Sequence, residues 1–262
     1  MLWIGLPRGG SSVSRENEAV RLVELEGCLN FRDLGGYLTR GGRRVRRGRL
    51  YRSDALHHMS ERDVLHVRDE LGVRAIIDLR STAEVVSNGS GPLLAPPMSY
   101  HHVPLFDGGR SDVEEQEIPT DLGHQYFLLL KTAWVHVARV LEILIDGSAP
   151  TIFHCAAGKD RTGVVAAVIL GLLDVEEADI VEDYVFTSRN LDRIIERLRQ
   201  TASYKDVFER LPPDTLHAEP TTMASFLARV QEACGSIRRF ALTAGLEEET
   251  ITRLEDWLLE EA

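Results

Sequence analysis

Residues 151–173 read TIFHCAAGKDRTGVVAAVILGLL and carry the strongest structural signal in the chain. The run from Thr151 to His154 predicts a short strand that is bounded by turn residues. From Arg161 to Leu173 the sequence is apolar almost all round, which predicts a buried helix too short to span a bilayer. The segment between them is therefore a loop at the carboxyl end of a strand, where α/β sheets place their ligands.

Strand-like and helical patterns alternate on both sides of this stretch. We predict strands over residues 21–25, 74–79 and 100–106, a hairpin over residues 37–52, and helices over residues 60–71, 125–145 and 176–199, with two more starting at residues 222 and 247. This alternation indicates an α/β fold with a central, mainly parallel sheet flanked by helices. We expect a flexible N-terminal tail over residues 1–18, a single domain over residues 19–262, and a lid loop within it over residues 108–124.

The composition excludes several classes of protein. The chain has 262 residues, of which 44% are hydrophobic and 27% are charged, as in an ordinary soluble domain. Its formal net charge of −11 argues against general nucleic-acid binding, and no apolar run reaches the roughly 18 residues of a membrane span. The N-terminus lacks a secretory signal, so we expect a cytoplasmic protein, with leaderless secretion as the alternative. The three widely spaced cysteines predict neither a disulfide framework nor a metal site.

The loop from His154 to Gly163 holds the residues that we expect to bind an anion and to react with it. Successive backbone N–H groups and the start of the following helix form a nest for a phosphate-sized anion. In that field the Cys155 thiolate is favoured as a nucleophile, and Arg161 holds phosphoryl oxygens with its forked donors. Thr162 donates to the thiolate and helps it leave, whereas His154 orients the loop through backbone contacts rather than acting as a general base.

The remaining loop residues shape the anion site. Gly158 permits the tight turn, and the small side chains of Ala156 and Ala157 keep the floor of the pocket open. The predicted phosphate-binding residues are consecutive: Ala156, Ala157, Gly158, Lys159, Asp160 and Arg161. A cysteine and an arginine with five residues between them occur by chance in many proteins. Here the pattern coincides with a strand, a glycine-bearing loop and a buried helix.

This loop resembles the phosphate-binding loop of cysteine-dependent protein tyrosine phosphatases. Other segments resemble the bacterial tyrosine/serine phosphatases: GCLNFRDLGGY (27–37), GRLYRSDAL (48–56), GVRAIIDLRSTAEV (72–85) and CGSIRRFALTAGLEEETITRL (234–254). The likeness covers roughly residues 20 to 258. It implies a phosphocysteine intermediate, no metal or other cofactor, and activity on phosphotyrosine, often also on phosphoserine, phosphothreonine and phosphoinositides.

Three aspartates are candidates for the acid that protonates the leaving group. Asp160, next to Arg161 within the loop, is the favoured candidate. Asp78 stands at the end of a predicted strand, and Asp107 follows another strand in the position where related phosphatases carry their acid. The alternative for Asp78 is a salt bridge with a neighbouring arginine, and for Asp107 a plain loop carboxylate. The general acid must lie within hydrogen-bond distance of the leaving-group oxygen, and the sequence does not give that distance.

Basic residues raise two further hypotheses. Lysine is scarce in this chain, with only Lys131, Lys159 and Lys205. The loop lysine Lys159 is therefore a candidate rim cation for multiply phosphorylated substrates, and the alternative is a solvated rim residue without such a role. Seven of the thirteen residues from Arg40 to Arg52 are arginine. They either steer anionic substrates or form an exposed hairpin whose arginines pair with surplus carboxylates. The segment GRLYRSD places Arg52 closer to the site than the others.

We therefore predict a phosphatase for phosphotyrosine, with phosphoserine and phosphothreonine as further candidate substrates. A phosphoinositide phosphatase with the same chemistry is one alternative, and a non-catalytic phospho-binding module is another. Arsenate reductases and rhodaneses also use cysteine loops, but an arsenate reductase needs a resolving thiol that neither Cys28 nor Cys234 is known to supply. The expected partner is a phosphorylated protein or phosphoinositide, without nucleic acid or stable membrane insertion, in an oligomeric state that sequence leaves open.

Overall fold

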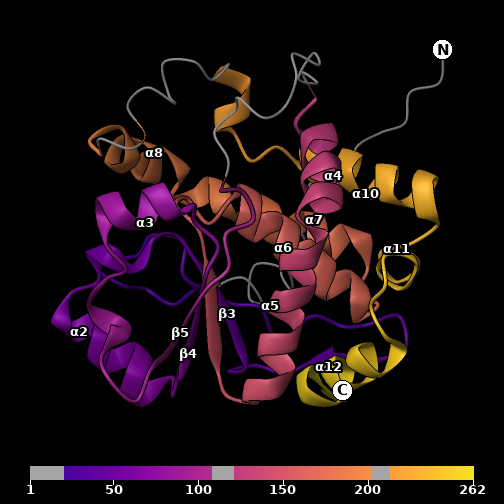
Figure 1. The fold of residues 1–262 in the computed structure, drawn as a ribbon, viewed down its shortest axis with the longest axis horizontal. Helices are drawn as coiled ribbons and strands as arrows, with labels where there is room; N and C mark the ends of the chain where they lie inside the picture. The colour runs from indigo at the N-terminus through magenta and orange to yellow at the C-terminus, as the bar shows by residue number, and fades with distance from the viewer. Residues whose placement is uncertain (1–20, 108–120, 202–203, 205–212) are drawn as a thin grey trace.

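Strand β6 (Thr151–His154) lies in the middle of a five-stranded sheet. The computed structural model describes residues 21–107, 121–201, 204 and 213–262. In the sheet order β1-β3-β6-β4-β5, the other strands are β1 (Arg32–Asp33), β3 (Leu50–Ser53), β4 (Ala75–Asp78) and β5 (Ser99–His102) (Figure 1). All neighbouring pairs are parallel except β1 with β3. The predicted mainly parallel α/β sheet is therefore confirmed.

The carboxyl ends of the three central strands lie level with one another. His154 is opposite Ser53 of β3 on one side and opposite Asp78 of β4 on the other. Because parallel strands finish at the same edge, this register brings the residues that follow Ser53, Asp78 and His154 together. The loop from Cys155 onward begins at this edge.

Alternating side chains of the sheet face two separate apolar clusters. Ile77 and Phe153 enter the large cluster, whereas Ile76 and Ile152 enter the smaller one on the opposite face, as the two-residue period of a strand requires. The large cluster is built mostly from helices α4 (Leu122–Thr132), α5 (Trp134–Gly147), α6 (Asp160–Leu172), α7 (Glu177–Val185), α10 (Pro220–Cys234), α11 (Ile237–Thr243) and α12 (Glu248–Leu258). In Figure 1, α4 and α5 form a column, with α12 beside the lower end of α5.

The smaller cluster lies beneath short helical segments. They comprise a 3-10 turn at Leu56–His58, α2 (Glu61–Leu65) with its π-helical continuation at His66–Glu70, and a 3-10 turn at Pro92–Leu94; α3 (Thr82–Asn88) follows β4. Ser60 caps α2 as predicted, in a capping box with Asp63. Among the described helices, none is both long and apolar enough to cross a membrane.

Several predicted elements differ in the structure. The hairpin predicted over residues 37–52 is confirmed only in its first part. The Thr39 amide donates to Arg43 O and the Val45 amide donates to Tyr37 O, but β2 (Arg43–Val45) also pairs with β7 (Leu259–Glu261). The chain turns at Gly48, where φ is +70°, and then enters the central sheet as β3. The predicted strand over residues 21–25 is only a bridge between Leu22 and Arg32.

Two predicted helices are each divided. The helix over residues 125–145 breaks at Ala133, so α4 packs on α10 while α5 packs on α12. The helix over residues 176–199 divides into α7, a 3-10 turn at Phe186–Arg189, and α8 (Leu191–Arg199). The tail over residues 1–18 and most of the predicted lid loop fall outside the described residues. The end of that loop is instead the start of α4, where Asp121 accepts a hydrogen bond from the Gly123 amide.

Candidate active site

The loop from Cys155 to Lys159 connects β6 to α6, as predicted. Gly158 has a φ of +66°, and a Cβ atom added to it would lie 2.5 Å from the Ser53 carbonyl oxygen. Glycine is therefore required here both by the backbone conformation and by the close approach of β3. The side chain of Cys155 is only 2% exposed, and it lies at the base of this loop.

Donors from other segments hold the loop carbonyls on its outer side. The Ala55 amide donates to Ala156 O over 3.0 Å, and Asn30 Nδ2 donates to Ala157 O over 3.1 Å. Gly158 O accepts from Arg52 Nη2 over 2.7 Å and from Asn30 Nδ2 over 3.2 Å. Three successive carbonyls of the loop are thus held by donors from β3, from the residue Ala55 that follows it closely, and from Asn30.

Arg161 meets a carboxylate that our sequence interpretation missed. Its Nη1 and Nη2 donate to the two oxygens of Glu84 over 2.5 and 2.8 Å, and the Tyr204 hydroxyl also donates to Glu84. Burial alone raises the pKa of Glu84, but the hydrogen bonds and charge of Arg161 lower it to about 2. The pair is thus fully ionised near neutral pH, and it fixes the plane of the guanidinium.

Glu84 is placed by the first turn of α3. Ser81 caps this helix, its side chain accepts from the Glu84 amide, and Glu84 Oε2 accepts from the Ser81 amide over 2.7 Å. The spacing Ser-x-x-Glu is a capping-box signal that predicts the start of α3. The contact with Arg161 lies beyond that local signal, because 77 residues separate the two in sequence.

Two further residues of the predicted motif, Thr162 and His154, are fully buried. The Thr162 hydroxyl has no hydrogen-bond partner among the described residues. His154 Nδ1 lies 3.1 Å from Cys155 O, which fits the predicted orienting contact, and burial lowers the pKa of this imidazole. Burial raises the pKa of the Cys28 thiol well above its usual value, so this cysteine is an inert core residue.

The three candidate acids have different surroundings. Asp160 is the first residue of α6, its side chain is 43% exposed, and it accepts from the Tyr126 hydroxyl over 2.5 Å. Asp78 is fully buried and accepts from Arg80 in a close ion pair and from the Tyr100 hydroxyl. Although burial raises the pKa of Asp78, nearby His154 and the Arg80 guanidinium together hold it well below its usual value.

Asp107 is an exposed carboxylate tied to the start of α3. It accepts from the Thr82 amide and from the Thr82 hydroxyl, both over 2.6 Å. These hydrogen bonds, the side-chain one first, lower the pKa of Asp107 below its usual value. Of the three aspartates, only Asp160 directly follows the loop that carries Cys155.

The Lys159 ammonium is buried and does not face solvent. Lys159 is 4% exposed, and its Nζ donates to Thr215 O over 2.5 Å and to His217 O over 3.3 Å. It also lies 3.2 Å from Asp160 Oδ1. The expectation of a solvent-facing rim cation is therefore wrong for this conformation, because backbone carbonyls satisfy the ammonium and cover it.

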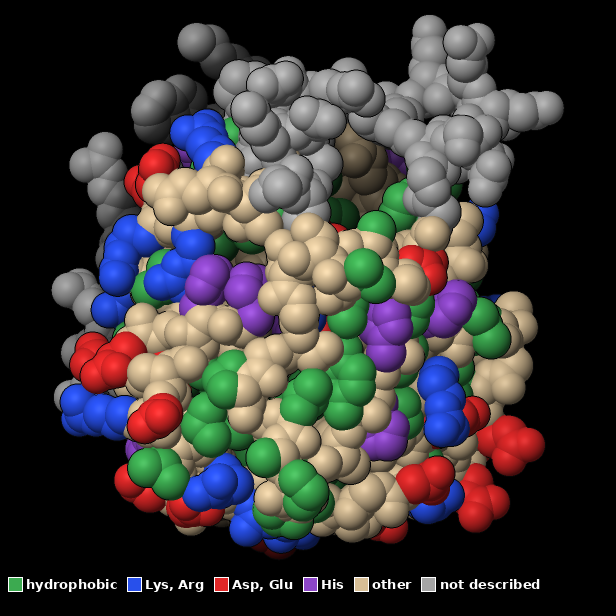
Figure 2. Space-filling model, turned by 60° about the vertical axis from the view of Figure 1, so that its left-hand side comes forward, with side chains coloured by type: hydrophobic (Ala, Val, Ile, Leu, Met, Phe, Trp, Pro, Cys, Tyr) green, Lys and Arg blue, Asp and Glu red, His purple; other side chains and the backbone are tan. Residues whose placement is uncertain are grey.

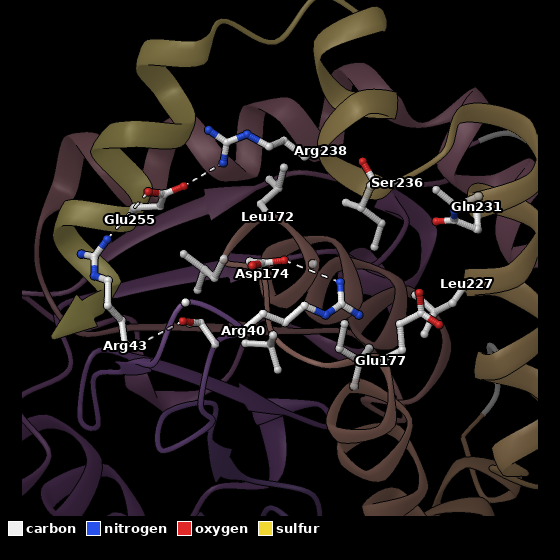
Figure 3. Close-up of a pocket in the computed structure, with 18 of the residues that line it drawn as sticks. Arg40, Arg43, Leu172, Asp174, Glu177, Leu227, Gln231, Ser236, Arg238 and Glu255 are labelled. Carbon is white, nitrogen blue, oxygen red and sulfur yellow. Dashed lines mark hydrogen bonds and ion pairs between the residues drawn. The ribbon is translucent and has the colours of Figure 1, made fainter. Parts of the chain in front are cut away.

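The arginine-rich segment divides between two places. Arg40 pairs with Asp174 and Glu176, and Arg43 pairs with Glu255, as the interpretation of an exposed hairpin expects. Both line a cavity of about 690 Å³ at the carboxyl end of α6, far along that helix from Cys155 (Figure 3). Arg52, by contrast, is fully buried against the loop, as its segment indicated. On the face drawn in Figure 2, basic and acidic side chains are interspersed.

The chain is similar to named phosphatases over part of its length. It is 31% identical to a tyrosine-protein phosphatase of Nostoc commune over 44% of this chain and 40% of the relative. It is 27% identical to the triple specificity protein phosphatase PtpB of Mycobacterium tuberculosis, over 46% of this chain and 48% of the relative. The chain thus spans less than half the length of these curated relatives.

Two solved structures are among those that the chain matches. The Siw14 catalytic core is 15% identical, with a TM-score of 0.41, over 87% of this chain and 98% of that one. TpbA of P. aeruginosa is 14% identical, with a TM-score of 0.31, over 70% and 91%. A family model described as the tyrosine phosphatase family matches residues 23–260, nearly the whole chain. The chain therefore belongs to the tyrosine phosphatase family.

Proposed function

We propose that this chain hydrolyses phosphotyrosine through a covalent phosphocysteine on Cys155, without a metal ion. One observation carries the proposal: Cys155 lies at the base of a strand–loop–helix nest whose arginine, Arg161, is already held flat by Glu84. Such a nest binds a phosphate dianion through backbone amides and a forked guanidinium. The cysteine side chain then stands behind the phosphorus, opposite the leaving group.

In the first step the Cys155 thiolate attacks phosphorus. A sulfur–phosphorus bond forms, the bond from phosphorus to the phenolic oxygen breaks, and Asp160 gives that oxygen its proton. Arg161 and the loop amides stabilise the charge that spreads over the equatorial oxygens in the transition state. The partial exposure of Asp160 and its place beside Arg161 support this assignment over Asp78 and Asp107.

In the second step water attacks the phosphocysteine. Asp160, now ionised, takes a proton from the water, the sulfur–phosphorus bond breaks, and inorganic phosphate leaves. The departing thiolate needs a donor, and the buried, unpartnered hydroxyl of Thr162 is suited to that task. Both steps use only groups of this chain and water.

We propose that phosphoserine and phosphothreonine are also substrates, since the mycobacterial relative is named a triple specificity protein phosphatase. The alternative of a phosphoinositide phosphatase is supported in the sequence by Lys159 as a rim cation and is opposed by the acidity of the chain. The contacts of Lys159 with Thr215 O and His217 O weaken that alternative. Comparing turnover of a phosphotyrosine peptide with that of inositol lipids in vesicles separates the two activities.

The test uses the native chain, Cys155→Ser and Arg161→Lys with p-nitrophenyl phosphate and a phosphotyrosine peptide, in buffer containing a chelator. We expect turnover by the native chain, none by Cys155→Ser, and a large loss in Arg161→Lys, because lysine lacks the forked donor geometry. Turnover that survives in Cys155→Ser excludes the phosphocysteine mechanism. Binding without turnover by the native chain instead supports a phospho-binding module.

A further inference from the structure

A cluster of buried charges lies directly beneath the loop that holds Cys155. Arg32 and Arg52, both fully buried, share the single carboxylate of Asp183, which is 1% exposed. Arg32 Nε donates to Asp183 Oδ1 over 3.1 Å, and Arg52 Nη1 donates to Asp183 Oδ2. Two guanidinium groups against one carboxylate leave a surplus of one positive charge at this place.

The surplus positive charge lies next to the loop that holds Cys155. Arg52 Nη2 donates to Gly158 O over 2.7 Å, and a Cβ added at Gly163 would lie 3.8 Å from the same nitrogen. The Arg52 guanidinium therefore lies beneath the loop, between its glycine turn and the first turn of α6. Asn30 extends the cluster, because it accepts from Arg32 Nη1 over 2.5 Å and donates to Ala157 O and Gly158 O.

Further charged groups lie near the cluster. Arg21 lies 3.9 Å from Glu182, and the buried Asp54 carboxylate accepts from the Asn30 amide over 3.0 Å. Burial, followed by the charge of Arg52, lowers the pKa of Arg32 to about 9. Burial raises the pKa of Asp183, but the charges of Arg52 and Arg32 outweigh it and bring it to about 2. An apolar cluster of the same volume would avoid this desolvation cost, so the arrangement suggests a task beyond packing.

We propose that Arg52 is a positioning residue of the phosphate loop, and that the uncompensated charge of the Arg32–Asp183–Arg52 cluster favours the thiolate of Cys155 and the bound dianion. This inference rests on the proposed function of the loop. The same side chain orients the Gly158 carbonyl outward and supplies a positive potential from behind. At low effective dielectric such a charge acts over the thickness of one loop.

Other titratable groups around the loop are constant in the comparison below. They are Arg161 of α6, Glu84 of α3, Tyr204 after α8, His154 at the end of β6, and Asp54 after β3. Asp160 and Lys159 stand at the start of α6. None of these residues is replaced in the test, so a change in thiolate reactivity reports on the buried cluster.

The experiment measures alkylation of Cys155 by iodoacetamide, followed by mass spectrometry of its peptide over a range of about pH 5 to 9. We expect Arg52→Gln to shift the alkylation profile by about one pH unit to higher pH, a tenfold loss of thiolate on the acidic side. Asp183→Asn removes a negative charge and shifts the profile in the opposite direction. Arg40→Gln, at the distant cavity of Figure 3, leaves the profile unchanged.

Shifts in the same direction for Arg52→Gln and Asp183→Asn, or no shift in either, overturn the proposal. A cluster that only supports the fold would not shift the alkylation profile in opposite directions when opposite charges are removed. If Asp183→Asn does not fold, Arg52→Lys decides the question. It keeps the charge and must keep the native profile, and an equal shift in Arg52→Lys and Arg52→Gln contradicts the electrostatic role. Alkylation needs no turnover, so this result is independent of whether Cys155→Ser abolishes phosphatase activity.

Discussion

Arg161 and Glu84 meet through two parallel hydrogen bonds, so the guanidinium has its orientation before any phosphate arrives. A guanidinium that had to be ordered during the reaction would lose part of its binding energy to that ordering. Glu84 is itself fixed by its place in the capping box of α3. The helix start and the arginine are therefore parts of one arrangement.

Replacing this carboxylate tests the arrangement. We expect Glu84→Gln to lower kcat on p-nitrophenyl phosphate by about 10- to 100-fold, because the amide offers only one acceptor to the guanidinium. Steady-state kinetics measure the effect. Glu255→Gln is the matched control, since that glutamate pairs with Arg238 at the far cavity and its loss should leave kcat unchanged. Equal kcat values for both variants would contradict the role of Glu84.

Leaving-group dependence identifies the general acid. We expect Asp160→Asn to reduce kcat by about 100-fold for phosphotyrosine, and less for p-nitrophenyl phosphate, whose leaving group departs without a proton. Asp107→Asn should affect the two substrates equally. Kinetics with both substrates measure this difference, and the reverse pattern would assign the acid to Asp107.

The strand–loop–helix unit was predictable because all its parts are contiguous. Residues 151–173 alone predict the turn between β6 and α6 and the burial of α6. They also single out Cys155 and Arg161 as candidate site residues. Glu84 and Asn30 were not found, because they reach the loop from distant segments whose local patterns report only a helix start and a turn. The division of the 125–145 helix at Ala133 depends on packing partners that a periodic apolar pattern does not distinguish.

The turn at Gly158 offers a direct test of this unit. We expect Gly158→Ala to lower the free energy of unfolding by about 1–3 kcal/mol and to abolish phosphate binding, because the added Cβ meets the β3 backbone at a φ of +66°. Urea unfolding and calorimetric titration with phosphate measure the two effects. Gly147→Ala, where a Cβ meets nothing within 4 Å, is the control and should retain both properties.

The 3-10 turn at Leu56–His58 makes stability depend on pH. Burial, and then the neighbouring His58, lowers the pKa of His57 to about 4 from the ordinary 6.5. Between these two values the unfolded chain binds a proton that the folded chain does not, so stability falls as the pH drops from 6.5 toward 4. We expect His57→Gln to reduce this loss in urea unfolding at about pH 5 relative to pH 7. An unchanged loss would show that other groups cause it.

For the molecule as a whole, we propose that residues 19–262 form a single phosphatase domain. Its large apolar cluster joins segments from Leu34 to Leu259. The loop that holds Cys155 lies at one end of α6, and β2 and β7 lie near the other. Stability and catalysis should therefore be separable by substitutions at the far end.

Leu259, which is 3% exposed, provides that substitution. We expect Leu259→Ala to lower the free energy of unfolding by about 2–5 kcal/mol and to leave kcat at low temperature unchanged. Leu242→Ala, at a position 37% exposed, is the matched control and should change stability by less than about 0.5 kcal/mol. Urea unfolding and steady-state kinetics measure both quantities, and a parallel loss of kcat would show that the two ends are coupled.

The pairing of β2 with β7 also has a kinetic meaning. Val45 and Leu259 are register partners although nearly the whole described chain separates them. Contacts between segments so distant in sequence carry a large loop-closure entropy and form late during folding. Until they form, the edge of β2 and the apolar side chain of Leu259 are exposed to other molecules. The interval before this closure is therefore when the newly made chain most needs protection from aggregation.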